Sequence, residues 1–137
     1  MVTIARDDDP AAAKLVSDGL ETFNREVGRH PNPLPLNVVL RDDDGKVRGG
    51  VLAWFAHDSV YVDTVWLDEA LRGRDHGSAM LAMVEDEARA RGAEQVWLYT
   101  VSWQAPEFYE KRGYRVFGEL PYRLRDGHKR LFFWKTL

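Results

Sequence analysis

A loop that combines two arginines with two glycines lies between an apolar run and a helical pattern, at residues 72–78 (RGRDHGS). The first turn of a helix has unpaired N–H groups and the positive end of the helix dipole, which together attract anions. Gly73 and Gly77 let the backbone approach a ligand closely. Arg72 and Arg74 supply the positive charge that a pyrophosphate needs. Because the loop lacks both the lysine of a P-loop and the three glycines of a dinucleotide fingerprint, it predicts a phosphate site of a different class.

An acidic residue, Asp63, stands in an otherwise mostly apolar run, residues 60–67, that we expect to form a strand. Regular alternation places Asp63 on one face of this strand with Tyr61 and Val65, and the residues between them on the other face. A carboxylate on a half-buried strand costs free energy unless it has a partner or a use. Asp63 is therefore either a catalytic base or a carboxylate satisfied by a neighbouring strand or by water.

The composition limits the class of protein. The chain has 137 residues, the length of one domain, and it contains no cysteine, which excludes disulfides, thiolate metal sites and cysteine nucleophiles. Its net charge is −3 and its basic residues occur as scattered pairs, so we expect no nucleic-acid partner. The four histidines lack metal-ligand spacing, and we expect no metal. Apolar runs of at most six residues and an acidic N-terminus predict a cytoplasmic protein without a membrane segment.

Helix signals occur in three places. Asp9 and Pro10 form a helix start, the acidic cap followed by proline in the first turn, and the following apolar spacing ends at Gly28. A second helical pattern over residues 80–88 stops at Gly92, and a short helix is expected at residues 106–111.

Strand patterns fill most of the remaining chain, and residues 30–35, with three prolines, are expected to be loop. Gly49 and Gly50 inside one strand suggest a bulge or a close backbone approach. The predicted order is β-α-β-β-β-α-β-α-β-β, a mixed α/β fold whose strand–helix–strand unit over residues 60–101 forms a parallel crossover in a mostly antiparallel sheet. The expected strands are residues 2–5, 36–40, 47–55, 60–67, 95–101, 114–118 and 129–137.

Two segments in register resemble the signatures of one enzyme family. Residues 72–78 resemble the R/Q-x-x-G-x-G/A motif of the GNAT acyltransferase superfamily. Residues 104–114 (QAPEFYEKRGY) resemble its second signature, an alanine followed by an aromatic–tyrosine pair and a glycine–aromatic pair. The resemblance covers essentially the whole chain. It implies a single GNAT-like domain over residues 1–137, with a central pair of parallel strands that splay apart.

The resemblance also implies where acetyl-CoA would lie as co-substrate. The strands at residues 60–67 and 95–101 would part around it, and its pantetheine arm would pair with main chain near Trp66 and Leu67. Its pyrophosphate would rest on the amides of residues 72–78, and a main-chain N–H near Leu67 would act as the oxyanion hole. The implied cofactor-binding residues are Trp66, Leu67, Arg72, Gly73, Arg74, Asp75, His76, Gly77, Ser78, Ser102 and Phe108.

The implied activity is N-acetyl transfer to a primary amine by direct attack through a tetrahedral intermediate. Tyr109 matches the family tyrosine that gives a proton to the leaving thiolate. Asp63 is the candidate base, and the alternative is a water chain with no dedicated base. Glu21 and Asn24, off the apolar stripe of the first helix, are candidates for contact with the substrate, a small molecule or a peptide amine.

Two departures from the family pattern keep an alternative function open. Asp75 stands where the motif has its first glycine, and as a preferred N-cap residue it is expected to cap the amides that would bind phosphate. Ser102 stands where an asparagine often contacts the cofactor. The alternative is a non-catalytic acyl-CoA-binding sensor or interaction module on the same fold, with a module that binds no ligand as a third reading. Pairing of the C-terminal strands across a two-fold axis would give a homodimer.

Overall fold

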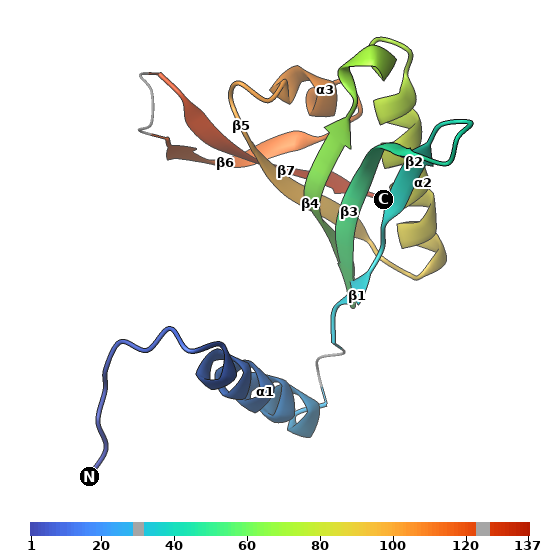
Figure 1. The fold of residues 1–137 in the computed structure, drawn as a ribbon. Helices are drawn as coiled ribbons and strands as arrows, with labels where there is room; N and C mark the ends of the chain where they lie inside the picture. The colour runs from blue at the N-terminus through green and yellow to red at the C-terminus, as the bar shows by residue number, and fades with distance from the viewer. Residues whose placement is uncertain (29–31, 123–126) are drawn as a thin grey trace. The chain divides into compact units, whose positions relative to one another are not determined.

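The computed structural model describes residues 1–28, 32–122 and 127–137 (Figure 1). The chain groups into two compact units, Met1–Asn32 and Pro33–Leu137. The expectation of one domain over residues 1–137 stays a prediction. The expected loop at residues 30–35 lies partly outside the described residues.

The described part of the N-terminal unit contains one helix, α1 (Pro10–Glu26). The predicted start is confirmed, because the Asp9 side chain accepts a hydrogen bond from the Ala11 N–H at 3.2 Å and Pro10 opens the first turn. Gly28 follows the helix with a φ of 67°, a backbone conformation that favours glycine at a helix end. The strand expected at residues 2–5 is wrong, because a strand needs a hydrogen-bonded neighbour and residues 1–28 provide none.

The second unit is built on a seven-stranded sheet with the order β1-β3-β4-β5-β7-β6, and β2 also pairs with β3. Among the described strands, β4 and β5 are the one parallel pair, which confirms the predicted crossover. The mixed α/β class is also confirmed, although the element order begins with a helix. The strands are β1 (Leu34–Pro35), β2 (Val38–Arg41), β3 (Val47–Ala56), β4 (Ser59–Leu67), β5 (Gln95–Val101), β6 (Arg115–Pro121) and β7 (Lys129–Thr136).

The end of the proline-rich segment forms β1, so the loop expected there is too long. Leu34 and Pro35 pair with Phe55 and Trp54 of β3. Proline cannot donate a backbone hydrogen bond, but a short strand at the sheet edge tolerates it. Leu36 then donates its N–H to a carbonyl of β3 at 2.9 Å, which continues the contact after the strand ends.

The helices of this unit are α2 (His76–Ala90), α3 (Pro106–Glu110) and the short 3-10 helix η1 (Glu69–Leu71). Met80, Leu81, Val84 and Ala88, the apolar stripe that predicted α2, are buried in the core with Phe133 of β7. The Asp68 side chain caps η1 by accepting from the Ala70 N–H at 2.9 Å. None of the helices within residues 1–28, 32–122 and 127–137 combines the length and the apolar character needed to cross a lipid bilayer.

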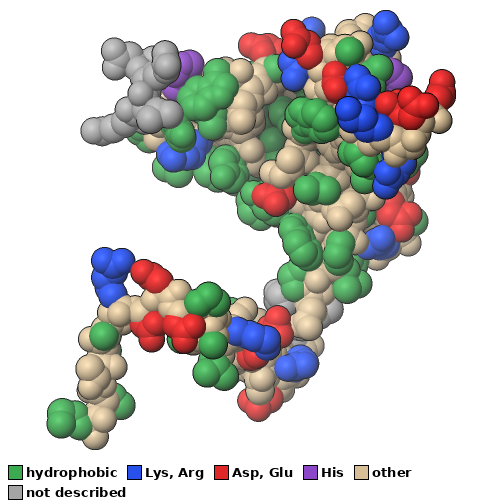
Figure 2. Space-filling view, in the orientation of Figure 1, with side chains coloured by type: hydrophobic (Ala, Val, Ile, Leu, Met, Phe, Trp, Pro, Cys, Tyr) green, Lys and Arg blue, Asp and Glu red, His purple; other side chains and the backbone are tan. Residues whose placement is uncertain are grey.

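A buried ion pair ties α2 to the C-terminal strand. Glu85, only 6% exposed, accepts a hydrogen bond from the Tyr114 hydroxyl at 2.8 Å and one from the Lys135 ammonium at 2.7 Å. The pKa of Tyr114 is raised far above its ordinary value by burial and then by the neighbouring Glu85 carboxylate. On the face drawn in Figure 2, Lys and Arg side chains are interleaved with Asp and Glu side chains.

Candidate active site

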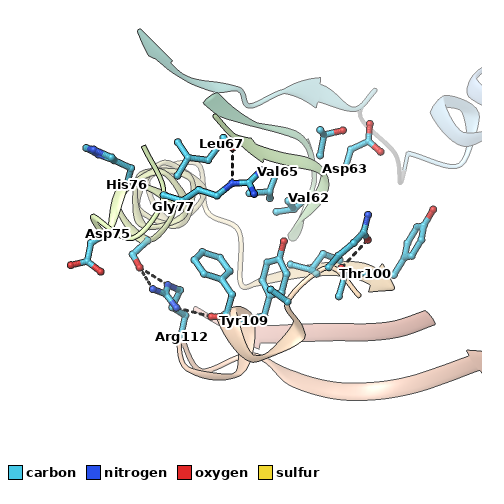
Figure 3. A pocket seen from close by; sticks show the side chains of 18 of the residues that line it. Val62, Asp63, Val65, Leu67, Asp75, His76, Gly77, Thr100, Tyr109 and Arg112 are labelled. Carbon is cyan, nitrogen blue, oxygen red and sulfur yellow. Dashed lines mark hydrogen bonds between the residues drawn. The ribbon is translucent and has the colours of Figure 1, made fainter. Parts of the chain in front are cut away.

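Two neighbouring strands separate and leave a cavity between them. β4 and β5 pair over four positions, the last being Val62 with Leu98, and then continue to Leu67 and Val101 without pairing to each other. A cavity of about 640 Å³ lies between the parted strands, the loop before α2, and α3 (Figure 3). This volume is typical of a small-molecule site. The facing strand edges also leave main-chain groups open to pair with an extended ligand.

A β-bulge sets the direction of the side chains at this edge. Val62 pairs with Ala53 of β3, but Thr64 pairs with Leu52, so Asp63 is an extra residue without a partner across the strand. The predicted face assignment is therefore wrong beyond Asp63. The bulge reverses the alternation, so that Val65, like Val62, packs towards the core.

Asp63 lies at one end of the cavity and is solvent exposed. Tyr99 lines the cavity, and Tyr61, two residues before Asp63, packs against Trp97 with ring centroids 4.4 Å apart. The pKa of Tyr61 is raised by burial and further by the Asp63 carboxylate. This end of the cavity therefore presents an accessible negative charge beside aromatic rings.

The opposite end of the cavity is formed by the loop and the first turn of α2 (Figure 3). Asp75 has a φ of 62° and makes no side-chain hydrogen bond to the helix, so the expected cap is absent and that prediction is wrong. The left-handed backbone, a conformation that the motif glycine would adopt without strain, turns the carboxylate away from the first amides. The N–H groups of the first turn are consequently left without a cap from Asp75.

Two arginines brace the loop that leads to this helix. Arg72 donates its Nε–H to the Leu67 carbonyl at 3.1 Å and lines the cavity. Arg48 of β3 bridges Asp42, at 3.3 Å, and Asp68, at 3.0 Å. The Ala70 amide lowers the pKa of the Asp68 carboxyl, and Arg48 lowers it further. These contacts fix the start of the loop without covering the amides of α2.

Tyr109 lies on α3 between the two ends of the cavity. Its side chain is 8% exposed, packed against Phe108, Tyr114 and Phe133, and its hydroxyl points towards the parted strands (Figure 3). Burial raises the pKa of Tyr109, so the phenol keeps its proton at neutral pH. A buried phenol beside a cavity is suited to donate a proton or a hydrogen bond.

Most of the predicted site residues meet in this cavity, and some do not. Trp66 and Arg74 do not line it, and Ser102 instead hydrogen-bonds His128 at 3.0 Å and accepts from the Lys129 N–H at 3.0 Å. The predicted residues that line the cavity are Asp63, Leu67, Arg72, Gly73, Asp75, His76, Gly77, Ser78, Phe108 and Tyr109. Glu21 and Asn24 lie on α1, in the other unit, and stay predictions.

The structure adds residues to the cavity wall that the sequence did not single out. Gln104 accepts hydrogen bonds through Oε1 from the Thr100 hydroxyl and the Val101 N–H, both at 3.0 Å, and so stabilises the end of β5. Arg112 follows α3 and bonds Ser78 of α2. Both belong to the second sequence signature, but their contacts depend on tertiary packing that spacing does not reveal.

Comparison with known proteins identifies a family whose members this chain resembles. Residues 4–114 match the Acetyltransferase (GNAT) family. The chain is 33% identical over 112 residues to acetyltransferase Atu2258 of Agrobacterium fabrum, with 82% of each chain covered. It is also 33% identical over 107 residues to blasticidin-S acetyltransferase of Streptomyces morookaense, covering 77% of this chain and 79% of the other.

Solved structures share the fold. An acetyltransferase from Bacillus cereus has a TM-score of 0.86 and 27% identity, with 98% of each chain covered. Two more distant neighbours, with TM-scores of 0.67 and 0.63, were solved with acetyl coenzyme A and with coenzyme A. At 17% and 16% identity these two show the fold alone.

Proposed function

Since the chain belongs to the acetyltransferase (GNAT) family and is an acyltransferase, we propose that it moves an acetyl group from acetyl-CoA to a primary amine. The observation that carries this proposal is the arrangement of one cavity: helix amides and arginines at one end, a buried phenol in the middle and a carboxylate at the other end. The helix amides and arginines would bind the phosphates, the phenol would lie near the thioester, and the carboxylate would meet the amine. The three groups therefore follow one another along the cavity in the order that these reactants require.

The residues of the cavity fit acetyl-CoA as the acetyl donor. The first turn of α2, left uncapped by Asp75, offers N–H groups to a pyrophosphate, and Arg72 adds positive charge. The unpaired edge of β4 near Leu67 suits the amides of a pantetheine arm, and we assign the oxyanion hole to a main-chain N–H there. Acetyl-CoA, when bound, supplies the activated acetyl group.

The roles of the polar side chains follow from their positions. Tyr109 holds a proton at neutral pH and donates it towards the sulfur that leaves. Asp63, at the other end of the cavity, accepts a proton from the attacking amine, which must be neutral to react. The negative charge of Asp63 also favours an acceptor that arrives as a cation.

A small-molecule acceptor is the favoured substrate class. The relative from Streptomyces morookaense is named for acetylation of blasticidin S, which supports a small molecule over a peptide. The second candidate function, an acyl-CoA sensor without turnover, would use the same phosphate end but gives no role to Tyr109. A buried tyrosine hydroxyl beside the thioester position favours the enzyme.

The test combines binding with turnover. Titration calorimetry with acetyl-CoA measures binding, and release of free thiol from acetyl-CoA in the presence of a panel of primary amines measures transfer. The Tyr109→Phe variant should bind acetyl-CoA as the wild type does and lose at least about a hundredfold in kcat. Tyr122→Phe, which removes a hydroxyl outside the cavity, should match the wild type.

Each result separates the functions. Micromolar binding with amine-dependent thiol release establishes the acetyltransferase. Binding without release with any amine supports the sensor. Absence of binding overturns both functions.

A further inference from the structure

Arg112 joins the phosphate end of the cavity to the helix that carries Tyr109. It donates its Nε–H to the Ser78 hydroxyl oxygen at 2.6 Å, and Nη2 also bonds that oxygen. Nη1 donates to the Phe108 carbonyl at 2.7 Å, and the guanidinium stacks on the Phe108 ring, 3.9 Å from its centroid. The side chain is therefore held in one position before any ligand arrives, at a small remaining cost in conformational entropy.

The position of Arg112 leaves part of its hydrogen-bonding capacity for a ligand. A guanidinium has five N–H bonds, and the three contacts above use one on Nε, one on Nη1 and one on Nη2. One N–H on each terminal nitrogen remains for a further acceptor. Because Arg112 lines the cavity and is only partly buried, such an acceptor can reach it from the cavity.

The surroundings of Arg112 favour an anion as that acceptor. Ser78 belongs to the first turn of α2, whose N–H groups already attract negative charge. Arg72 and His76 line the same part of the cavity, and Asp75, the acid at this end, points its carboxylate away from Tyr109 (Figure 3). Asp63, the other lining acid, lies at the far end. Two arginines, Arg72 and Arg112, therefore outnumber the one acid, Asp75, at this end of the cavity.

We propose that Arg112 binds the phosphate groups of the acetyl-CoA and is a specificity residue for donors that carry them. This inference rests on the proposed function. Charge-assisted, preorganised hydrogen bonds from a guanidinium are among the stronger contacts that a phosphate makes. The opposing explanation is a purely structural role, in which Arg112 braces α3 against α2 and never touches the ligand.

Two donors that differ only in their phosphate-bearing nucleotide separate these explanations. Acetyl-CoA and S-acetylpantetheine share the thioester and the pantetheine arm, but the second has no phosphate. Arg112→Gln should raise the KM and Kd for acetyl-CoA by about ten- to a hundredfold and leave those for S-acetylpantetheine within about twofold. Arg112→Lys keeps the positive charge but loses the paired N–H donors of the guanidinium, so it should recover part of the affinity for acetyl-CoA.

Controls make the outcome decisive. Arg115→Gln removes an arginine outside the cavity wall and should change neither donor's kinetics. Circular dichroism checks the fold of each variant. If Arg112→Gln unfolds, the two donors are compared with Arg112→Lys instead. Equal losses with both donors would assign Arg112 a bracing role and overturn the inference. If the wild type binds neither donor, the proposed function itself fails, a result distinct from the first.

Discussion

The ring of Phe108 lies against the backbone of Gly77, so that a Cβ added to Gly77 would stand 3.2 Å from the nearest ring atom. This contact joins the first turn of α2, the proposed phosphate end of the cavity, to α3. The next residue on α3, Tyr109, meets Phe108 edge to face with ring centroids 5.1 Å apart. A change at Gly77 is therefore transmitted to the neighbour of the proposed proton donor.

A β-branched residue at Gly77 should weaken binding of acetyl-CoA. Gly77→Val pushes the Phe108 ring away from α2, and overpacking of this kind costs about 1–3 kcal/mol. We expect the Kd for acetyl-CoA, measured by calorimetry, to rise about tenfold or more. Ala79→Val introduces the same β-branched side chain at an exposed position two residues along the same helix and should bind acetyl-CoA normally. Equal affinity in the two variants would contradict the role of this contact.

Local signals made most of the fold predictable. Asp9 and Pro10 identify a helix start by their own chemistry, and the alternation in residues 95–101 predicts a strand whose bounds the structure reproduces. The bulge at Asp63 was not predictable, because its sequence shows no interruption of the strand pattern and only the register with β3 reveals it. A single inserted residue reverses every later side chain.

In the candidate site, too, some features were predictable from the sequence and others were not. The loop at residues 72–78 was predictable as the segment that leads into α2, and several of its residues line the cavity, whereas its binding of a phosphate stays a prediction. The direction of the Asp75 carboxylate was not, because it depends on a left-handed φ that the residue type alone does not dictate. The contact of Arg112 with Ser78 was not predictable, because it forms only when α3 packs on α2. Ser102 was expected at the cofactor because of its position before the second motif, whereas in the structure its side chain hydrogen-bonds His128.

Asp63→Asn should slow transfer in a pH-dependent manner. If Asp63 accepts the proton of a cationic amine, its loss lowers kcat/KM at pH 7 by about a hundredfold. With an acceptor whose amine has a pKa of about 8, the amine is already neutral above about pH 9, so the difference from the wild type should close between about pH 7 and pH 10. Asp43→Asn, in the exposed β2–β3 turn, is the matched control. A constant ratio of wild-type to variant kcat/KM across pH 6–10 would instead assign Asp63 to substrate binding.

Asp75→Gly should raise both stability and cofactor affinity. Relief of a left-handed φ at a non-glycine residue is worth about 1 kcal/mol in the free energy of unfolding, measured in urea. Asp75→Asn removes the charge while keeping a residue that tolerates this φ, so it should leave stability unchanged within about 0.5 kcal/mol. Both variants should bind acetyl-CoA more tightly, because a negative charge near the phosphates is gone. Tighter binding by the glycine variant alone would assign the effect to backbone strain.

Replacing Glu85 with leucine should destabilise the fold strongly. The change leaves the Lys135 ammonium, whose side chain is 23% exposed, without its carboxylate partner, and breaking such a pair costs about 3 kcal/mol. Adding Lys135→Met and Tyr114→Phe should recover most of that free energy in urea unfolding, because apolar side chains can replace the ion pair once the Tyr114 hydroxyl, which donates to Glu85, is removed as well. Glu87→Leu breaks the exposed pair with Arg91 and should cost about 1 kcal/mol or less. Equal losses in the free energy of unfolding for Glu85→Leu and Glu87→Leu would contradict the expectation that the buried ion pair matters more for stability than the exposed one.

Alkaline pH should unfold the protein through its buried tyrosines. Burial raises the pKa of Tyr109, and burial and Glu85 raise that of Tyr114, whereas the unfolded chain releases these protons near pH 10. The unfolded state then binds fewer protons than the folded state, so the stabilisation is complete below pH 10 and is lost as the pH rises above it. Tm measured by circular dichroism between pH 8 and 11 should fall more steeply for the wild type than for Tyr114→Phe, with Tyr122→Phe behaving as the wild type. Parallel curves for Tyr114→Phe and the wild type would show that other groups cause the alkaline loss.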